Sequence, residues 1–155
     1  MSRELRHDFA PIFLMTMVGL FTGNVAYCGD ASFTVEARVG YRTVRNNEEF
    51  SVFTSVRNIG KTVQLLRVWS CSYPQQWTTD NASVQVKQVS CRKNYLSQVK
   101  LEPGEVYEKP LSLSANVGAA QKLITFRLGL DLEASAVAAS ASRVWSNELT
   151  VKIAD

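Results

Sequence analysis

Histidine is the side chain that most often moves protons or binds zinc near neutral pH, and this chain holds one, His7. His7 lies in an amino-terminal segment that we expect to be removed from the mature protein. Without it the chain cannot build a Ser-His-Asp or Cys-His relay, and it lacks the commonest ligand of zinc and copper. The sequence therefore predicts a protein without the usual hydrolase chemistry.

Acidic side chains could still form the paired carboxylates of a glycoside hydrolase. Candidates are Glu48 with Glu49, the glutamates of the 102–108 stretch, and Asp131 with Glu133. Each of these positions fits a solvated turn or the outward side of a strand better than a catalytic pair. The sequence has no EF-hand calcium loop and no glycine-rich phosphate loop. We expect no enzyme activity, no metal and no cofactor.

The stretch WSCSYPQQW, residues 69–77, gathers aromatic side chains next to a cysteine. In an extended segment Trp69, Cys71 and Tyr73 share one face, so Trp69 is expected to pack against a disulfide in the core. Alternatively, Tyr73, Trp77 and Tyr95 form an exposed aromatic cluster on a rigid loop, which would suit sugar rings or peptide anchors. Both interpretations remain open for Trp77, which stands in a polar stretch.

Cys71 and Cys91 are expected to form a disulfide, because the chain is predicted to reach an oxidising compartment. A bridge that closes a loop of this length stabilises a protein by about 3 kcal/mol in the chain-entropy model. The alternative is a pair of buried free thiols. A third cysteine, Cys28, lies in the segment that we expect to be cut away.

Residues 1–31 resemble a secretory signal peptide, with early arginines, an apolar run over 9–21 and then small residues. Small residues place cleavage after Cys28 or after Ala31, leaving a mature domain of residues 32–155. The alternatives are a retained membrane anchor over 9–28 and a lipoprotein acylated at Cys28. We expect a secreted or periplasmic protein without stable membrane insertion once the signal is removed.

Residues 32–155 contain 15 Lys and Arg and 11 Asp and Glu, which gives a net charge of +4. The basic residues are scattered among the expected strands, and no aromatic RNA-binding motif accompanies them. Nucleic acid is therefore not an expected partner, and solubility is a sufficient explanation of the charge.

Alternation of apolar and polar residues dominates the expected mature domain and predicts β-strands. Seven runs show it, at 33–41, 50–58, 62–73, 83–91, 106–114, 123–132 and 145–153. The 62–73 run is apolar on both sides and is expected to be a central strand, whereas Pro110 predicts an edge or a bulge. A change of parity near Gln88 predicts a bulge or strand end, and residues 133–143 read as a long loop. The predicted fold is an all-β, seven-stranded antiparallel immunoglobulin-like sandwich.

Two turn motifs, in SVRNIGKTVQLL and LEPGEVYEKPLSL, resemble those of bacterial immunoglobulin-like modules. Cell-adhesion-related bacterial immunoglobulin-like domains and the intracellular proteinase inhibitor family are similar in this respect. The resemblance covers residues 51–114 and implies a fold more than a function. The sequence departs from antibody domains, because Trp69 and Cys71 share one strand.

From these features we expect an exported, non-catalytic module that binds another envelope or extracellular protein. An edge strand, or the loop held by Cys71 and Cys91, would form the contact. The first alternative is carbohydrate binding through Tyr73, Trp77 and Tyr95. The second is protease inhibition by an exposed loop, which the family resemblance implies.

Overall fold

A computed structural model describes residues 32–118, 120–133 and 143–154. The predicted signal peptide and most of the predicted 133–143 loop lie outside the described residues. The described part contains twelve strands and one short 3₁₀ turn: β1 (Phe33–Val39), β2 (Thr43–Arg45), β3 (Glu49–Asn58), β4 (Gln64–Trp69), η1 (Tyr73–Gln76), β5 (Trp77–Thr79), β6 (Val84–Val86), β7 (Leu96–Leu101), β8 (Val106–Ala115), β9 (Leu123–Phe126), β10 (Leu128–Asp131), β11 (Arg143–Trp145) and β12 (Leu149–Ala154). No helix in these ranges is long and apolar enough to cross a membrane.

One layer is a four-stranded sheet in the order β1-β3-β8-β6, and all its pairs are antiparallel. Alternate residues of β1, β3 and β8 are buried, as their period-2 pattern requires. Strands β1 and β3 are followed in space by β8 and then by β6. This is the strand order of the four-stranded sheet in an immunoglobulin-like sandwich.

The opposite layer is built from β11-β10-β5 and β2-β12-β9. Its strands β9 and β10 are interrupted only at Arg127 and bury the apolar side of the 123–132 run. Phe50 of the first layer meets Phe126 of the second edge to face, with ring centroids 6.4 Å apart. The apolar sides of the two layers therefore form one continuous core, as a β-sandwich requires.

The all-β sandwich is confirmed, and several details differ from the prediction. The twelve strands exceed the expected seven, and β2 pairs with β12 in parallel rather than antiparallel. The 62–73 run is not a central strand, because within the described ranges β4 pairs only with β7. Other details agree with the prediction: the 83–91 run ends as a strand at Val86, close to the strand end expected near Gln88. Pro110 lies opposite Phe53 in β8, beyond the stretch that pairs with β6, so it occupies an edge position as expected.

Candidate functional site

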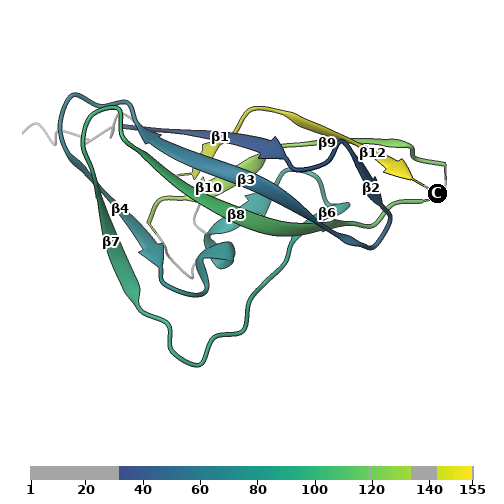
Figure 1. The fold of residues 1–155 in the computed structure, drawn as a ribbon, viewed down its shortest axis with the longest axis horizontal. Helices are drawn as coiled ribbons and strands as arrows, with labels where there is room; N and C mark the ends of the chain where they lie inside the picture. The colour runs from purple at the N-terminus through teal and green to yellow at the C-terminus, as the bar shows by residue number, and fades with distance from the viewer. Residues whose placement is uncertain (1–31, 119, 134–142, 155) are drawn as a thin grey trace, which may run out of the picture.

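Strands β4 and β7 separate from the body of the sandwich as a two-stranded extension. Figure 1 shows them side by side, diverging from β3 and β8, with the segment that leads into β7 forming the far loop. We refer to β4, β7 and residues 87–95 together as the arm. A two-stranded pair is marginally stable by itself, so the arm depends on contacts with the rest of the domain.

Asn58 ties the base of the arm together and is fully buried. Its side-chain amide donates to the carbonyls of Thr62 and Leu101, each at 2.9 Å, and its Oδ1 accepts from the Gly60 amide at 2.8 Å. Its backbone also pairs with Gly104 and Glu105 of the opposite turn. The N-x-G and L-x-P-G-E turns singled out in the sequence therefore meet at one side chain.

Gln76 holds the other end of β4 against the sandwich. The side-chain carbonyl of Gln76 accepts from the Trp69 amide at 2.9 Å, and its amide nitrogen donates to the Arg67 carbonyl at 3.0 Å. The same nitrogen also contacts the Asp131 carbonyl of β10 at 3.3 Å. A buried glutamine side chain thus takes the place of a neighbouring strand at this edge of β4.

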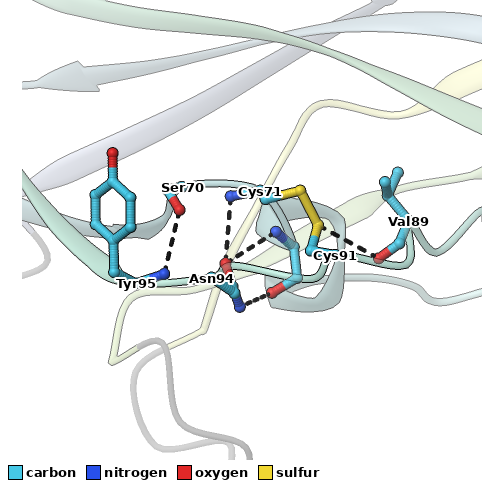
Figure 2. Close-up of a disulfide and its surroundings, with 7 residues drawn as sticks. Ser70, Cys71, Val89, Cys91, Asn94 and Tyr95 are labelled. Carbon is cyan, nitrogen blue, oxygen red and sulfur yellow. Dashed lines mark hydrogen bonds between the residues drawn. A yellow bond between two sulfur atoms is a disulfide. The ribbon is translucent and has the colours of Figure 1, made fainter.

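The disulfide between Cys71 and Cys91 is confirmed, with Cα atoms 6.1 Å apart. Figure 2 shows Asn94 beside it, accepting from the backbone amides of Cys71 and Ser72 and donating to the Ser72 hydroxyl. Backbone and side-chain bonds between Ser70 and Tyr95 continue the β4–β7 pairing up to this network. The loop segment of the arm is therefore restrained by covalent and polar contacts.

The arm presents apolar side chains to solvent on its outward face. Leu66, Val68 and Leu101 point into the core, so the alternate residues point out. Among these, Leu65 is 56% exposed and Leu96 is 41% exposed, and Leu96 lies directly opposite the half-buried Trp69. Tyr95, immediately before β7, is 67% exposed, and in Figure 2 its ring points away from the disulfide.

The charge of the domain is concentrated on the arm. Of the 15 basic and 11 acidic residues in 32–155, the arm holds five basic residues and no acidic one, so it carries +5 and the remainder −1. The five are Arg67, Lys87, Arg92, Lys93 and Lys100. Four of these lie within residues 87–100, and the pairing of β4 with β7 adds Arg67, while the other ten basic residues of 32–155 are spread over the remainder of the domain.

Two of the arm's lysines are already paired with glutamates at its margins. Lys100 lies 2.7 Å from Glu102, which raises the pKa of Lys100 by a hydrogen bond and by its charge. Lys87 lies 3.7 Å from Glu49. Arg92 and Lys93 are exposed beside the disulfide, and neither forms an ion pair with another described residue. These two residues are the basic groups best placed to meet a partner.

The three aromatic candidates from the sequence do not form one exposed cluster. Trp77 is 8% exposed and belongs to the core, because β5 pairs with β10 and turns the ring inward. Tyr73 is half-buried against that core and donates its hydroxyl to the Pro110 carbonyl at 2.7 Å. Only Tyr95 is open to solvent, so a ligand could not stack on all three rings.

A separate hollow of about 410 Å³ lies on the outer face of the four-stranded sheet. Phe53 is partly exposed there, with the Arg38 guanidinium 4.5 Å from its ring centre. Glu36, Arg57 and Glu108 add charges of both signs. No group of three or more metal-binding side chains occurs in the described ranges, and this hollow is no exception.

No protein-family model matches the chain, and no curated protein matches it in sequence. Its structure is similar to a FixG-related protein from Vibrio parahaemolyticus, at 16% identity over 79% of this chain and 96% of that one, with a TM-score of 0.44. The CARDB domain of PF1109 from Pyrococcus furiosus is similar at 17% identity over 79% and 94%, with a TM-score of 0.39. E. coli alpha-2-macroglobulin is similar at 11% identity over 77% of this chain and 6% of that one, with a TM-score of 0.45.

Proposed function

We propose that the chain is an exported, non-catalytic binding module and that the outward face of the arm contacts another protein of the envelope or the extracellular space. The observation that carries this proposal is the exposure of Leu65 and Leu96 on the outward face of a pinned two-stranded element, with Tyr95 exposed next to Leu96 in the chain. Exposed apolar side chains that gather in one place on a rigid scaffold are typical of interaction surfaces. The Cys71–Cys91 disulfide supports export, because such bridges persist in oxidising compartments.

The side chains on the arm match those that dominate protein interfaces. Arginine and the large aromatic residues supply most of the energetic anchors, and here Arg67 stands between Leu65 and Trp69 on the outward face. The restraints on the arm also reduce the entropy that binding would cost, since its backbone is already ordered.

The test compares a double leucine variant on the arm with a single leucine variant elsewhere on the surface. We would immobilise the mature domain, capture proteins from the envelope fraction of the producing cells, and repeat this with a Leu65→Ser, Leu96→Ser double variant. The control is Leu123→Ser on β9, because Leu123 is an exposed strand leucine opposite a lysine, as Leu65 is. A partner retained by wild type and control should be lost or weakened roughly fivefold or more by the double variant. Equal retention by both variants would refute the proposal.

Glycan binding is the second candidate, and it now rests on Tyr95 with the exposed side of Tyr73. Titration with cell-wall glycans while monitoring tyrosine and tryptophan fluorescence tests it, and a Tyr95→Ala variant should abolish any response. Protease inhibition is the third candidate, through the disulfide-bound 87–95 segment. Its test is whether the domain protects a substrate from a panel of proteases, with a Cys71→Ser, Cys91→Ser variant as the control.

A further inference from the structure

We propose that the partner of the arm is acidic, presenting carboxylates to Arg92 and Lys93 and apolar or aromatic side chains to Leu65 and Leu96. This inference rests on the proposed function and specifies the chemistry of its partner. The starting point is the separation of charge within the domain, with +5 on the arm and −1 on the rest of residues 32–155.

The imbalance of basic and acidic residues is visible along the sequence as well as on the surface of the arm. Between Ile59 and Leu101 the sequence holds six basic residues and one acidic residue, Asp80. Asp80 is occupied, because its carboxylate accepts from the backbone amide of Arg127 at 2.6 Å and from the Arg127 side chain at 2.8 Å. The arm itself contains no acidic side chain that would repel an anionic partner. A basic partner, in contrast, would be repelled by the like charges of the arm.

The position of the apolar groups favours a protein over a lipid bilayer. A loop that inserts into a bilayer carries its apolar residues at the tip, with basic residues behind them. Here the exposed apolar groups are divided between the far loop, where Val89 and Tyr95 stand on either side of Arg92 and Lys93 in the chain, and the strand face, where Leu65 and Leu96 are interleaved with Arg67 and Lys100. A flat face of mixed leucine and arginine fits a protein surface better than it fits the interior of a membrane.

The same apolar groups argue against a purely polyanionic ligand. Sulfated glycans and nucleic acids would satisfy the basic side chains, but a sugar-phosphate or sulfate backbone would leave Leu65 and Leu96 in water. An acidic polypeptide with aromatic residues satisfies both features. We therefore expect binding that depends on charge and on apolar contact together.

The experiment uses four defined probes and the mature domain, with binding followed by the fluorescence anisotropy of labelled protein. The probes are a mixed copolymer of glutamate and tyrosine, poly-glutamate of the same length, heparin, and vesicles of phosphatidylglycerol. We expect the mixed copolymer to bind tightest and poly-glutamate to bind several-fold more weakly. Binding should weaken as salt rises from low values to physiological strength, because screening shortens the range of the charges to about 8 Å.

Matched variants separate the contribution of the arm from that of net charge. An Arg92→Glu, Lys93→Glu variant lowers the arm from +5 to +1 and should weaken copolymer binding roughly tenfold or more. The control, Arg42→Glu with Lys152→Glu, makes the same change of net charge at exposed sites outside the arm and should stay within about twofold. The Leu65→Ser, Leu96→Ser variant should bind the copolymer no better than poly-glutamate.

Several outcomes would overturn the inference. Heparin or vesicles that bind as tightly as the copolymer would show a general response to anions, and equal effects of the two charge variants would show that the arm is not the site. If envelope capture depends on Leu65 and Leu96 but is unchanged by Arg92→Glu with Lys93→Glu, the proposed function stands and the acidic partner does not. If neither pair matters to capture, both proposals fail.

Discussion

Replacing Asn58 by alanine should release the base of the arm and destabilise the whole domain. The change removes three hydrogen bonds, to the carbonyls of Thr62 and Leu101 and from the amide of Gly60. Leu101 is buried, so its carbonyl would lose its partner away from water, at a cost of about 1–3 kcal/mol. The groups of Gly60 and Thr62 lie nearer the surface, where water can replace part of each bond, at about 0.5–1 kcal/mol apiece.

Together these losses predict a destabilisation of about 2–5 kcal/mol, to which the small cavity adds. That is a large fraction of the roughly 5–15 kcal/mol that stabilises an ordinary domain. The assay is urea unfolding followed by circular dichroism, with Asn116→Ala at an exposed position as the control. The denaturation midpoint of Asn58→Ala should fall sharply with little change in slope.

A second variant, Asn58→Asp, keeps the shape of the side chain and distinguishes a missing donor from a cavity. A carboxylate can still accept from Gly60, but it cannot donate to the carbonyls of Thr62 and Leu101. This environment would raise the pKa of the new carboxyl in the folded protein, so the variant should be least stable at neutral pH and recover partly as pH falls. A loss of less than about 1 kcal/mol for both variants would refute the view that Asn58 holds the two turns together.

Three further predictions concern the remainder of the fold. Cys71→Ser with Cys91→Ser should lower the free energy of unfolding by about 3 kcal/mol, and adding reductant to that variant should cause no further loss in urea unfolding. Burial raises the pKa of Asp80, but hydrogen bonds from the backbone and side chain of Arg127 and its charge outweigh burial, so the pKa lies below its usual value. The stability from this pair is therefore present above about pH 4 and is lost as pH falls through the folded-state pKa, so Asp80→Asn should flatten the acid limb of a stability curve. In a variant whose sole tryptophan is Trp77, emission should be blue-shifted and resist acrylamide quenching until unfolding, and a red, freely quenched emission would contradict its burial.

The alternating strands could be predicted because their determinants are local. Phe33, Val35 and Ala37 are buried in β1 as their spacing indicates, and so are Ile124, Phe126 and Leu128 along the 123–132 run. The turn at Pro103 and Gly104 follows from the same kind of signal, since Gly104 adopts a φ of 86° that favours glycine. Period and turn chemistry depend on near neighbours in the chain, which a single sequence displays.

The position of Trp77 could not be predicted because it depends on a distant strand. Its sequence neighbours are polar, which suggested a loop at the rim. In the fold, β5 pairs with β10, so that Trp77 lies opposite Leu130 and its ring enters the core. Composition near a residue does not specify which strand will pair with it, and a one-residue shift in that pairing would expose the ring.

Gln76 shows a second limit of sequence reasoning. Its side chain completes the hydrogen bonding of Arg67 and Trp69, which explains how β4 can leave the body of the sandwich without exposing that part of its backbone. A glutamine in a polar stretch gives no sign of this role. The basic character of the arm, in contrast, was visible in the sequence, because four of its five basic residues lie within 87–100 and only one acidic residue lies between Ile59 and Leu101.

The restraints on the arm bear on its function more directly than any single exposed residue does. Asn58 fixes its base, Gln76 fixes the end of β4, and the Cys71–Cys91 disulfide fixes the loop. The core alone would not require this loop, because residues 87–95 contribute no buried side chain to it. This loop lies outside the core and is held in one conformation that displays basic and apolar groups. Recognition of a partner therefore explains its restraints better than stability of the core does. If the Cys71→Ser, Cys91→Ser variant loses partner binding while β4 and β7 stay folded, an ordered 87–95 loop is needed for recognition as well as for stability.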